Sequence, residues 1–388
     1  MKKIKFKEFI KLQRGFDLPK KDMIEGPYPV VGSTSIIGYH KEYKVDPPGV
    51  ITGRSGSLGK LQYIDAKYWP HNTALWVKDF KGNYPRYVFY FLHTIDFQNF
   101  NAGAGVPTLN RNHLDNYDIS IHEGLDQIKI ASILSNYDDL IENNTKIIRL
   151  LEKIAKLIYD EWFVKFKFPG HEKIKFVDSE LGKIPEGWEV KKLEESVNNI
   201  ILGGTPARKN PNYWGGDVPW IKSGKLNDLR IIEGTETITQ EGLNKSATKM
   251  MPERTVLIAI TGAILISLSE IKLCANQSVV GLYGSKNFSQ EYLYLYQKKN
   301  IDQFISKMSG SAQQHVNKEI IQNSKILVSD IETMGSFNQI IKPIFNEISS
   351  LLFKNQTLKK TRDLLIPKLV SGKVDVSDLD IKVPEVKA

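Results

Sequence analysis

The sequence predicts an α+β protein made of two mixed, β-rich domains, each followed by one long helix with coiled-coil periodicity. Three observations lead to this prediction. The chain has 388 residues, which is enough for two or three domains. Two segments repeat apolar residues at heptad spacing, and the regions before them alternate short β-branched runs with Gly, Asn and Pro clusters. Several short motifs of the first half recur in the second half.

The first β-rich domain is expected over residues 1–125, where aromatic and β-branched runs are separated by turn residues. A long helix follows over 126–166. With Ile130 as heptad position a, the d positions are apolar throughout: Ile133, Leu140, Ile147 and Ile154. Such a stripe is typical of a helix packed along a partner helix.

The second half repeats this plan. A charged linker over 167–187 leads to a second β-rich domain over 188–330, a second long helix over 331–370 and a tail over 371–388. Asn144 interrupts the apolar stripe of the first helix at an a position, and Asn355 does so in the second. A polar residue at position a typically fixes the register of a coiled coil at a cost in stability. We therefore expect Asn144 and Asn355 to lie close together.

The recurring motifs predict a duplicated unit of one domain and one helix. The matches are Pro29-Val-Val-Gly-Ser with Pro219-Trp-Ile-Lys-Ser, Val50-Ile-Thr-Gly with Ala259-Ile-Thr-Gly, His71-Asn-Thr-Ala-Leu with Asn276-Gln-Ser-Val-Val, and Arg86-Tyr-Val-Phe-Tyr-Phe-Leu with Gln290-Glu-Tyr-Leu-Tyr-Leu-Tyr.

The net charge, the cysteine content and the length of the apolar stretches limit the classes of function that this chain can have. The formal net charge of +9 favours an acidic partner, and nucleic acid is the commonest one. The single cysteine, Cys274, allows no internal disulfide and no Cys-rich zinc site, which fits a reducing, cytoplasmic location. Apolar stretches are too short for a transmembrane helix.

Motifs of catalysis are incomplete. The loop Gly53-Arg-Ser-Gly-Ser-Leu-Gly-Lys has five residues between the outer glycines, and Leu61 follows its lysine, so it departs from a Walker A motif. The seven histidines show no metal-ligand spacing. We therefore expect no catalytic residues, no metal and no cofactor in this chain, and a role in recognition.

Five motifs, in this order, resemble the specificity subunit of type I restriction–modification systems: Leu134-Ser-Asn-Tyr-Asp-Asp-Leu-Ile-Glu-Asn-Asn, Leu181-Gly-Lys-Ile-Pro-Glu-Gly-Trp-Glu, Gly203-Gly-Thr-Pro, Tyr213-Trp-Gly-Gly-Asp-Val-Pro-Trp-Ile and Gly242-Leu-Asn-Lys-Ser-Ala. The resemblance covers essentially the whole chain, although the first half lacks a clear Gly-Thr-Pro element.

The resemblance implies that each β-rich domain is a target-recognition domain that reads one half of a split double-stranded DNA sequence. It also implies that the two helices form an antiparallel coiled coil, which acts as a spacer. Two methyltransferase (M) subunits then dock on the chain, and restriction and motor (R) subunits join them. S-adenosylmethionine, ATP and Mg would belong to those partners. A helix of about 36 residues is ~54 Å long, which is long enough to set the spacing of half-sites on one DNA face, about 34–36 Å.

Candidate DNA contacts are polar and basic residues near predicted turns, because Lys and Arg hold phosphates while Ser and Arg read base edges. In the first domain they are Tyr39, His40, Lys41, Arg54, Ser55, Ser57 and Lys60, and in the second Arg208, Lys209, Lys222, Lys225, Lys245 and Lys249.

Two alternatives stay open at this point. One is the specificity subunit of a related system in which methylase and nuclease are fused in one partner. The other is a coiled-coil adaptor whose β domains bind carbohydrate or peptide instead of DNA.

Overall fold

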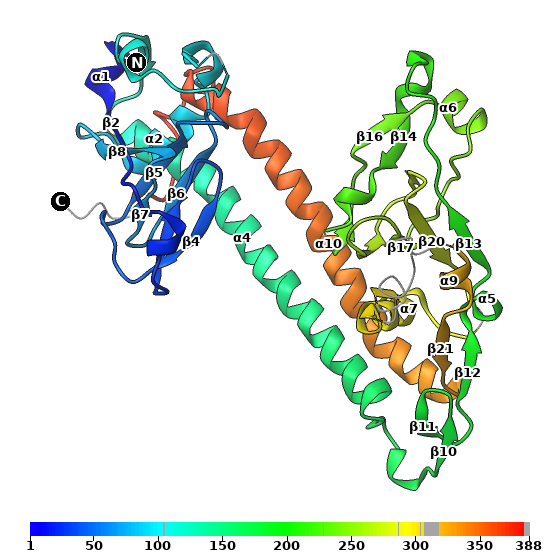
Figure 1. Cartoon of the computed structure of the whole chain (residues 1–388). Helices are drawn as coiled ribbons and strands as arrows, with labels where there is room; N and C mark the ends of the chain where they lie inside the picture. Colours follow the sequence, from blue (N-terminus) through cyan, green and yellow to red (C-terminus); the bar gives the residue numbers. More distant parts are fainter. Residues whose placement is uncertain (104, 228, 286, 303, 306–317, 384–388) are drawn as a thin grey trace. The chain divides into compact units, whose positions relative to one another are not determined.

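The computed structural model describes residues 1–383 apart from 104, 228, 286, 303 and 306–317 (Figure 1). Parts of the predicted second domain and of the predicted tail, the latter at 384–388, therefore lie outside the described residues. The chain divides into two compact units. Unit 1 holds Met1–Asn143 and Asn355–Ala388, and unit 2 holds Asn144–Lys354.

The β-rich part of unit 1, called the first domain below, contains three sheets. Their strand orders are β2-β8-β5-β6, β4-β3-β7 and β1-β9. The strands are β1 (Lys2–Lys5), β2 (Lys11–Arg14), β3 (Tyr28–Val31), β4 (Ile36–His40), β5 (Gly49–Gly53), β6 (Leu61–Ile64), β7 (Trp69–Pro70), β8 (Ala74–Asp79) and β9 (Asp118–Ile121), and the short helices are α1 (Phe6–Phe9), α2 (Pro85–Leu92) and α3 (Arg111–Asp115). Apolar residues of α1, α2 and the strands share one core, in which Phe9 packs against Phe91.

The second domain, in unit 2, follows the same plan. Its strands are β12 (Glu189–Lys192), β13 (Asn199–Leu202), β14 (Trp214–Ile221), β15 (Arg230–Ile231), β16 (Glu236–Ile238), β17 (Val256–Ala259), β18 (Ile266–Ser269), β19 (Cys274–Ala275), β20 (Val279–Tyr283) and β21 (Lys325–Val328), and its helices are α5 (Leu193–Ser196), α6 (Gln240–Asn244), α7 (Gln290–Lys299) and α9 (Lys318–Gln322). The preceding linker contains the hairpin of β10 (Phe176–Ser179) and β11 (Gly182–Pro185).

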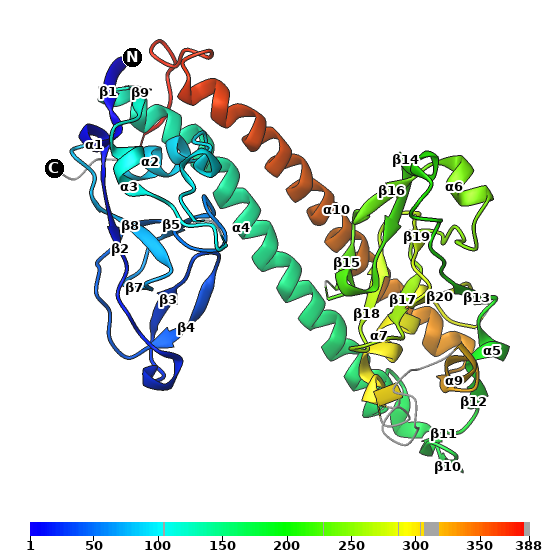
Figure 2. The same ribbon diagram turned by 45° about the horizontal axis from the view of Figure 1, so that its top comes forward.

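The sheets of the two domains match one for one, which confirms the duplication. The sheet β13-β20-β17-β18 repeats β2-β8-β5-β6 and adds β15 at its edge. The sheet β16-β14-β19 repeats β4-β3-β7, and in both the middle strand pairs antiparallel with the first strand and parallel with the last (Figure 2). The two-stranded sheet β12-β21 repeats β1-β9.

One predicted motif match is wrong by three residues. Gly53 pairs with Ala74 at the end of β5, and Ala259 pairs with Val279 at the end of β17. The segment that corresponds to Ala259-Ile-Thr-Gly is therefore Gly53-Arg-Ser-Gly, and not Val50-Ile-Thr-Gly. Its last residue, Gly56, has a φ of +82°, and Gly262 has a φ of +76°. The feature that the two turns share is a residue in the left-handed conformation. This conformation favours glycine, because glycine has no Cβ.

The two long helices are α4 (Leu125–Tyr159), which continues into a π-helical turn over Asp160–Val164, and α10 (Ile331–Val370). Within unit 1, Arg362 pairs with Asp138, and the Asn355 amide donates to the Ile141 carbonyl at 3.3 Å. Residue numbers rise along one helix as they fall along the other, so the helix segments of unit 1 are antiparallel.

The segments of α4 and α10 in unit 2 also run in opposite directions. The ring of Trp162 lies 5.8 Å from that of Phe337. Arg230 links Glu152 of α4 to the ring of Phe345, eight residues further along α10. The helix segments of unit 2 are therefore antiparallel as well.

The seam of α4 differs from the predicted one. Leu140 and Ile154, both placed at d positions, are 46% and 43% exposed. Ile130, Leu134 and Ala155 are buried, and they occupy a and e positions instead. A straight helix has 3.6 residues per turn, so residues spaced at a strict heptad rotate gradually around its surface. Some apolar residues of a wide stripe therefore lie outside the contact with the partner helix. Two of the four apolar side chains at d, Leu140 and Ile154, are therefore left facing solvent, while Ile133 and Ile147 are half-buried.

In the first domain, an ion-pair cluster ties α2 to the helix segments of unit 1. The Tyr90 hydroxyl donates to the Asp138 carboxylate, which also pairs with Arg362 of α10. Arg86 of α2 lies 3.9 Å from the same carboxylate and stacks on Tyr63, with its Cζ 4.2 Å from the ring centroid. Breaking one partner of such a half-buried cluster leaves charges unpaired, so the cluster fixes how the first domain sits on its helices.

Candidate nucleic-acid interface

The loop after β5 carries four predicted DNA contacts of the first domain. Its backbone is tightly held, because Arg54 donates to the Thr73 carbonyl at 3.0 Å and accepts from the Leu109 amide at 2.9 Å. The side chains of Arg54 and Ser55 are half-buried, and those of Ser57 and Lys60 are exposed. The loop therefore offers one arginine, two hydroxyls and one lysine on a fixed backbone, which are groups that suit phosphates and base edges.

The end of β4 carries the other three predictions for this domain. Tyr39 is 53% exposed and Lys41 is also exposed, so both can reach a ligand. His40 is only 5% exposed. Its Nδ1 accepts from the Ile24 amide at 3.0 Å, and its ring packs edge-on against Trp69. The structure therefore makes His40 a core residue that holds the hairpin, which corrects its prediction as a surface contact.

Two lysines stacked on aromatic rings extend this surface. Lys44 Nζ lies 4.7 Å from the ring centroid of Trp69, and Lys67 Nζ lies 4.3 Å from that of Tyr43. These two lysines were not predicted from the sequence, because they lie in different turns, Lys44 before β5 and Lys67 before β7. The Lys-Glu-Tyr-Lys run at 41–44, basic residues interleaved with an aromatic, was a signal that could have found one of them.

In the second domain, three of the predicted DNA contacts lie in two separate groups of charged side chains. Arg208 Cζ lies 3.6 Å from the ring centroid of Trp214, and the guanidinium pairs with Glu236 at 2.5 Å. Lys222 pairs with the other oxygen of Glu236 at 2.8 Å. Hydrogen bonds from Lys222 and Arg208 hold the pKa of Glu236 below its ordinary range. Lys245 lies apart from them after α6 and pairs with Glu241 at 3.0 Å.

The remaining predicted residues of this domain are Lys209, Lys225 and Lys249. Lys209 and Lys249 are exposed, and Lys225 is half-buried in a short 3-10 turn. The structure thus brings Arg208 and Lys222 together through one carboxylate, whereas Lys245 pairs with a different carboxylate, that of Glu241.

The duplication allows the two candidate sets to be compared. Val45 bonds to Tyr68, and Met251 bonds to Leu273 in the same way, so the turn over 41–44 corresponds to the longer segment over 239–250. Lys41 and the two lysines Lys245 and Lys249 therefore occupy corresponding connections. The loop of Arg54 instead corresponds to Ile260–Leu265, which contains no basic residue.

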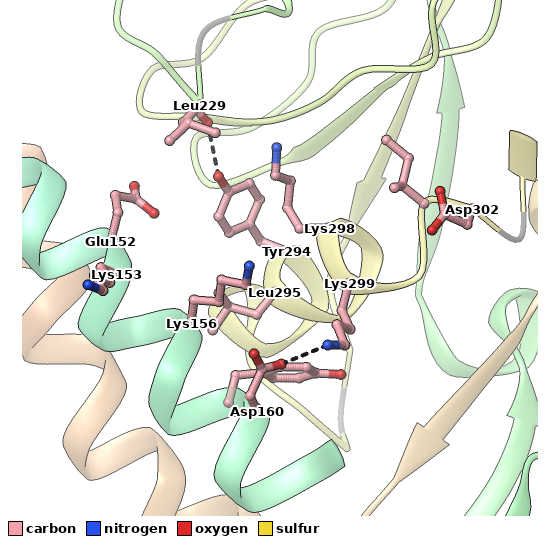
Figure 3. Close-up of a pocket in the computed structure, with 12 residues that line it drawn as sticks. Glu152, Lys153, Lys156, Asp160, Leu229, Tyr294, Leu295, Lys298, Lys299 and Asp302 are labelled. Carbon is pink, nitrogen blue, oxygen red and sulfur yellow. Dashed lines mark hydrogen bonds and ion pairs between the residues drawn. The ribbon is translucent and has the colours of Figure 1, made fainter. Parts of the chain in front are cut away.

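A pocket of about 440 Å³ lies between α4 and α7 in unit 2 (Figure 3). Lys153, Lys156 and Lys298 line it, and burial lowers the pKa of Lys298. Of its carboxylates, Asp160 pairs with Lys299 at 3.3 Å, and Glu152 pairs with Arg230. Four lysines and three carboxylates line the pocket together with apolar residues, and no residue predicted to contact DNA is among them.

Buried asparagines mark the middle of both helices. Asn144 is 4% exposed and Asn355 is 7% exposed. Asn144 is the first residue of unit 2 on α4, and Asn355 is the first residue on α10 that returns to unit 1.

Neither a metal centre nor a membrane segment emerges from the part of the chain that the structure describes. Within it, no three His, Cys, Asp or Glu side chains gather into a group that could bind a metal ion. The helices described there are all too short or too polar to cross a bilayer.

Comparison with known proteins places this architecture. The family described as "Type I restriction modification DNA specificity domain" matches residues 1–153 and 185–360. The MjaIX specificity subunit of Methanocaldococcus jannaschii is 25% identical over 307 residues, with 77% of this chain and 71% of the relative covered. The HindI specificity subunit of Haemophilus influenzae is 24% identical over 329 residues, covering 69% and 71%.

A solved structure agrees in fold. The S subunit of a type I restriction–modification system from M. genitalium superposes with a TM-score of 0.62 at 15% identity, over 95% of this chain and 96% of that one. Together with two β-rich domains of one topology and two long helices, the family match leads to a single assignment. The chain belongs to the type I restriction–modification specificity family and is a non-catalytic, DNA-binding target-recognition subunit.

Proposed function

We propose that this chain reads a bipartite DNA target with one half-site per domain, and that its two helices set the gap between the half-sites. The observation that carries the proposal is the duplication itself. Two domains with the same sheet order present the same backbone scaffold twice, and a protein that carries two such scaffolds is suited to a target in two parts.

The way each domain is fixed to its helices supports the spacer role. Tyr90 and Arg86 of the first domain contact Asp138 of α4. Arg230 of the second domain contacts Glu152 of α4. A domain held by a buried or half-buried charge cluster cannot rotate freely on its helix without leaving charges unpaired. Helix length would then determine the separation of the two reading surfaces.

The contact surface on DNA is proposed to include the accessible members of the predicted set. In the first domain these are Tyr39, Lys41, Arg54, Ser55, Ser57 and Lys60, and in the second Arg208, Lys209, Lys222, Lys225, Lys245 and Lys249. Most are cations, which would hold phosphates and fix orientation, while Arg54 and the two serines can reach base edges.

Two methyltransferase subunits are proposed to dock on the helices. Leu150, Ile154 and Leu157 of α4 are 60%, 43% and 52% exposed, and their spacing of four and three residues places them on one face. Such an apolar face suits a helical partner. S-adenosylmethionine would be bound by the methyltransferase, and ATP and Mg by the restriction and motor subunits. Partners encoded separately and a fused methylase–nuclease would both fit this face.

The test is a methylation assay with the chain, the methyltransferase subunit of its own system and S-adenosylmethionine, read by methylation-sensitive sequencing of random DNA. A split motif with a fixed gap is expected, and it should be lost when the chain is omitted. The Ile154→Glu variant should lose methylation while DNA binding persists, whereas Lys153→Glu, one residue away on the same helix, should retain methylation. A continuous motif, or methylation by this chain alone, would contradict the proposal.

A further inference from the structure

A pair of polar side chains occupies the same place in both domains. In the first domain, the Asn72 side-chain amide donates to the Asp17 carboxylate. In the second, the Thr205 hydroxyl donates to the Gln277 amide oxygen at 2.5 Å. In the first domain, the pair joins the segment after β2 to the turn after β7. In the second domain, it joins the segment after β13 to the turn after β19.

Backbone hydrogen bonds establish that the two places correspond. In the first domain, the amide of His71 donates to the carbonyl of Val31 at 2.8 Å. In the second, the amide of Asn276 donates to the carbonyl of Ile221 at 3.0 Å. Because Asn72 and Gln277 are the next residues along the chain, they hold equivalent positions.

In each domain, a glycine lets the segment that carries Asp17 or Thr205 approach the turn that carries the other member of the pair. A Cβ at Gly15 would lie 2.2 Å from the His71 carbonyl oxygen, and a Cβ at Gly203 would lie 2.1 Å from that of Asn276. Only glycine permits such a close approach of two backbones. Asp17 and Thr205 follow these glycines by two residues in each domain, so the same crossing of two segments creates both pairs.

The pairs are accessible, and one borders a hollow. The Asp17 side chain is 66% exposed, and Gln277 is also exposed. In the first domain, a hollow of about 690 Å³ is lined by Asp17 and Asn72 together with Leu18, Pro19, Lys20, Met23, Ile37 and His71. A cation stands close to the first pair, since Arg14 donates to Asp17 at 2.9 Å.

What differs between the domains is the chemistry that the pair presents. Asp17 is a carboxylate and accepts hydrogen bonds. In the second domain, the Thr205 hydroxyl occupies the Gln277 oxygen, so the two N–H donors of that amide remain for a ligand. The same pair of scaffold positions thus offers an acceptor in the first domain, from Asp17, and donors in the second, from Gln277.

We propose that Asp17–Asn72 and Thr205–Gln277 are the equivalent base-reading pairs of the two domains, each responsible for one position of its own half-site. The inference rests on the proposed function and names residues within it. A carboxylate suits a base with an amino group in the major groove, which is adenine N6 or cytosine N4. An amide with free donors suits an acceptor edge, such as guanine O6 and N7 or thymine O4.

Near-isosteric variants test the pairs without removing packing. Asp17→Asn replaces an acceptor by a group that also donates, and Gln277→Glu removes the donors. Each variant, assembled with its methyltransferase, should be assayed for methylation of a library randomised at every position of both half-sites. Asp17→Asn should change discrimination by about 5- to 100-fold at one position of the first half-site only. Gln277→Glu should do the same at one position of the second half-site only.

Exposed amides elsewhere in the same domains provide matched controls. Gln98→Ala in the first domain and Asn323→Ala in the second should leave every position unchanged. The proposal is overturned if the wild-type complex recognises a split target but both pair variants keep full discrimination. It is also overturned if either variant weakens all sequences equally, because that is the signature of a phosphate contact or of lost folding. A wild-type complex without sequence preference would instead overturn the proposed function.

Discussion

The Arg230 guanidinium donates to the Glu270 carboxylate at 2.7 Å, and both side chains are only 2% exposed. The same guanidinium bonds to Glu152 on α4 and stacks on Phe345 of α10, 4.1 Å from the ring centroid. Arg254 adds a further contact to Glu270 at 3.3 Å. Within unit 2, one buried cation therefore joins the sheet of the second domain to both helix segments.

Replacing Arg230 with alanine should lower the free energy of unfolding of unit 2 by about 3–5 kcal/mol, because Glu270 would stay buried with less of its charge compensated. Denaturant-dependent hydrogen exchange of amides in 144–354 measures this loss. Lys191→Ala is the matched control, since its partner Glu189 is 61% exposed and Lys191 itself is only half-buried, so that pair should contribute under about 1 kcal/mol. Equal losses in the two variants would show that the buried pair does not hold the domain.

Replacing both Asn144 and Asn355 with leucine should raise the free energy of unfolding, because removing polar groups from a helix seam typically stabilises it while loosening register. Thermal unfolding of the two single variants and the double variant gives the measurement. If the two asparagines are neighbours, as predicted from the sequence, the single effects will not add. Additivity within about 0.3–0.5 kcal/mol would place them apart.

Glu236→Gln should strengthen DNA binding uniformly across sequences and increase the salt slope by about one, since Arg208 and Lys222 would no longer be neutralised. Titration at several salt concentrations checks it, and Asp178→Asn in the linker hairpin serves as the control. The lowered pKa of Glu236 also gives a sign for pH. The ion pairs are complete at neutral pH and are lost as pH falls through the folded-state pKa, below the ordinary 4.5. A wild-type affinity that falls on acidification through that window would contradict the prediction.

Deleting one heptad from each helix, 144–150 together with 355–361, should shorten the helix pair by about 10.5 Å at 1.5 Å per residue. At 3.4 Å per base pair this corresponds to roughly three base pairs of gap. The half-sites should not change, because neither domain is touched. Three base pairs also turn the duplex by roughly 100° at 10–10.5 base pairs per turn, so overall activity is expected to fall.

A library with the same half-sites and variable gaps measures this change. Methylation confined to the original gap would show that the helices do not set the spacing. Altered half-sites would mean that the recognition domains were assigned to the wrong residues.

The sequence by itself determined the architecture. Heptad repeats over two long segments are a local signal, and they predicted α4 and α10. The repeated motifs around His71 and Asn276 predicted the duplicated domain, because a turn and the strand after it are encoded in a few adjacent residues.

Only the tertiary structure decided which side chains are available to a partner. Ile154 belongs to an apolar row, yet it faces solvent, because the direction of a seam depends on how the partner helix lies. His40 is polar, yet it is a core residue, because Ile24 and Trp69 fold over it. The pair Asp17–Asn72 could not be found in the sequence, because its members are 55 residues apart and meet only where Gly15 lets two backbones cross.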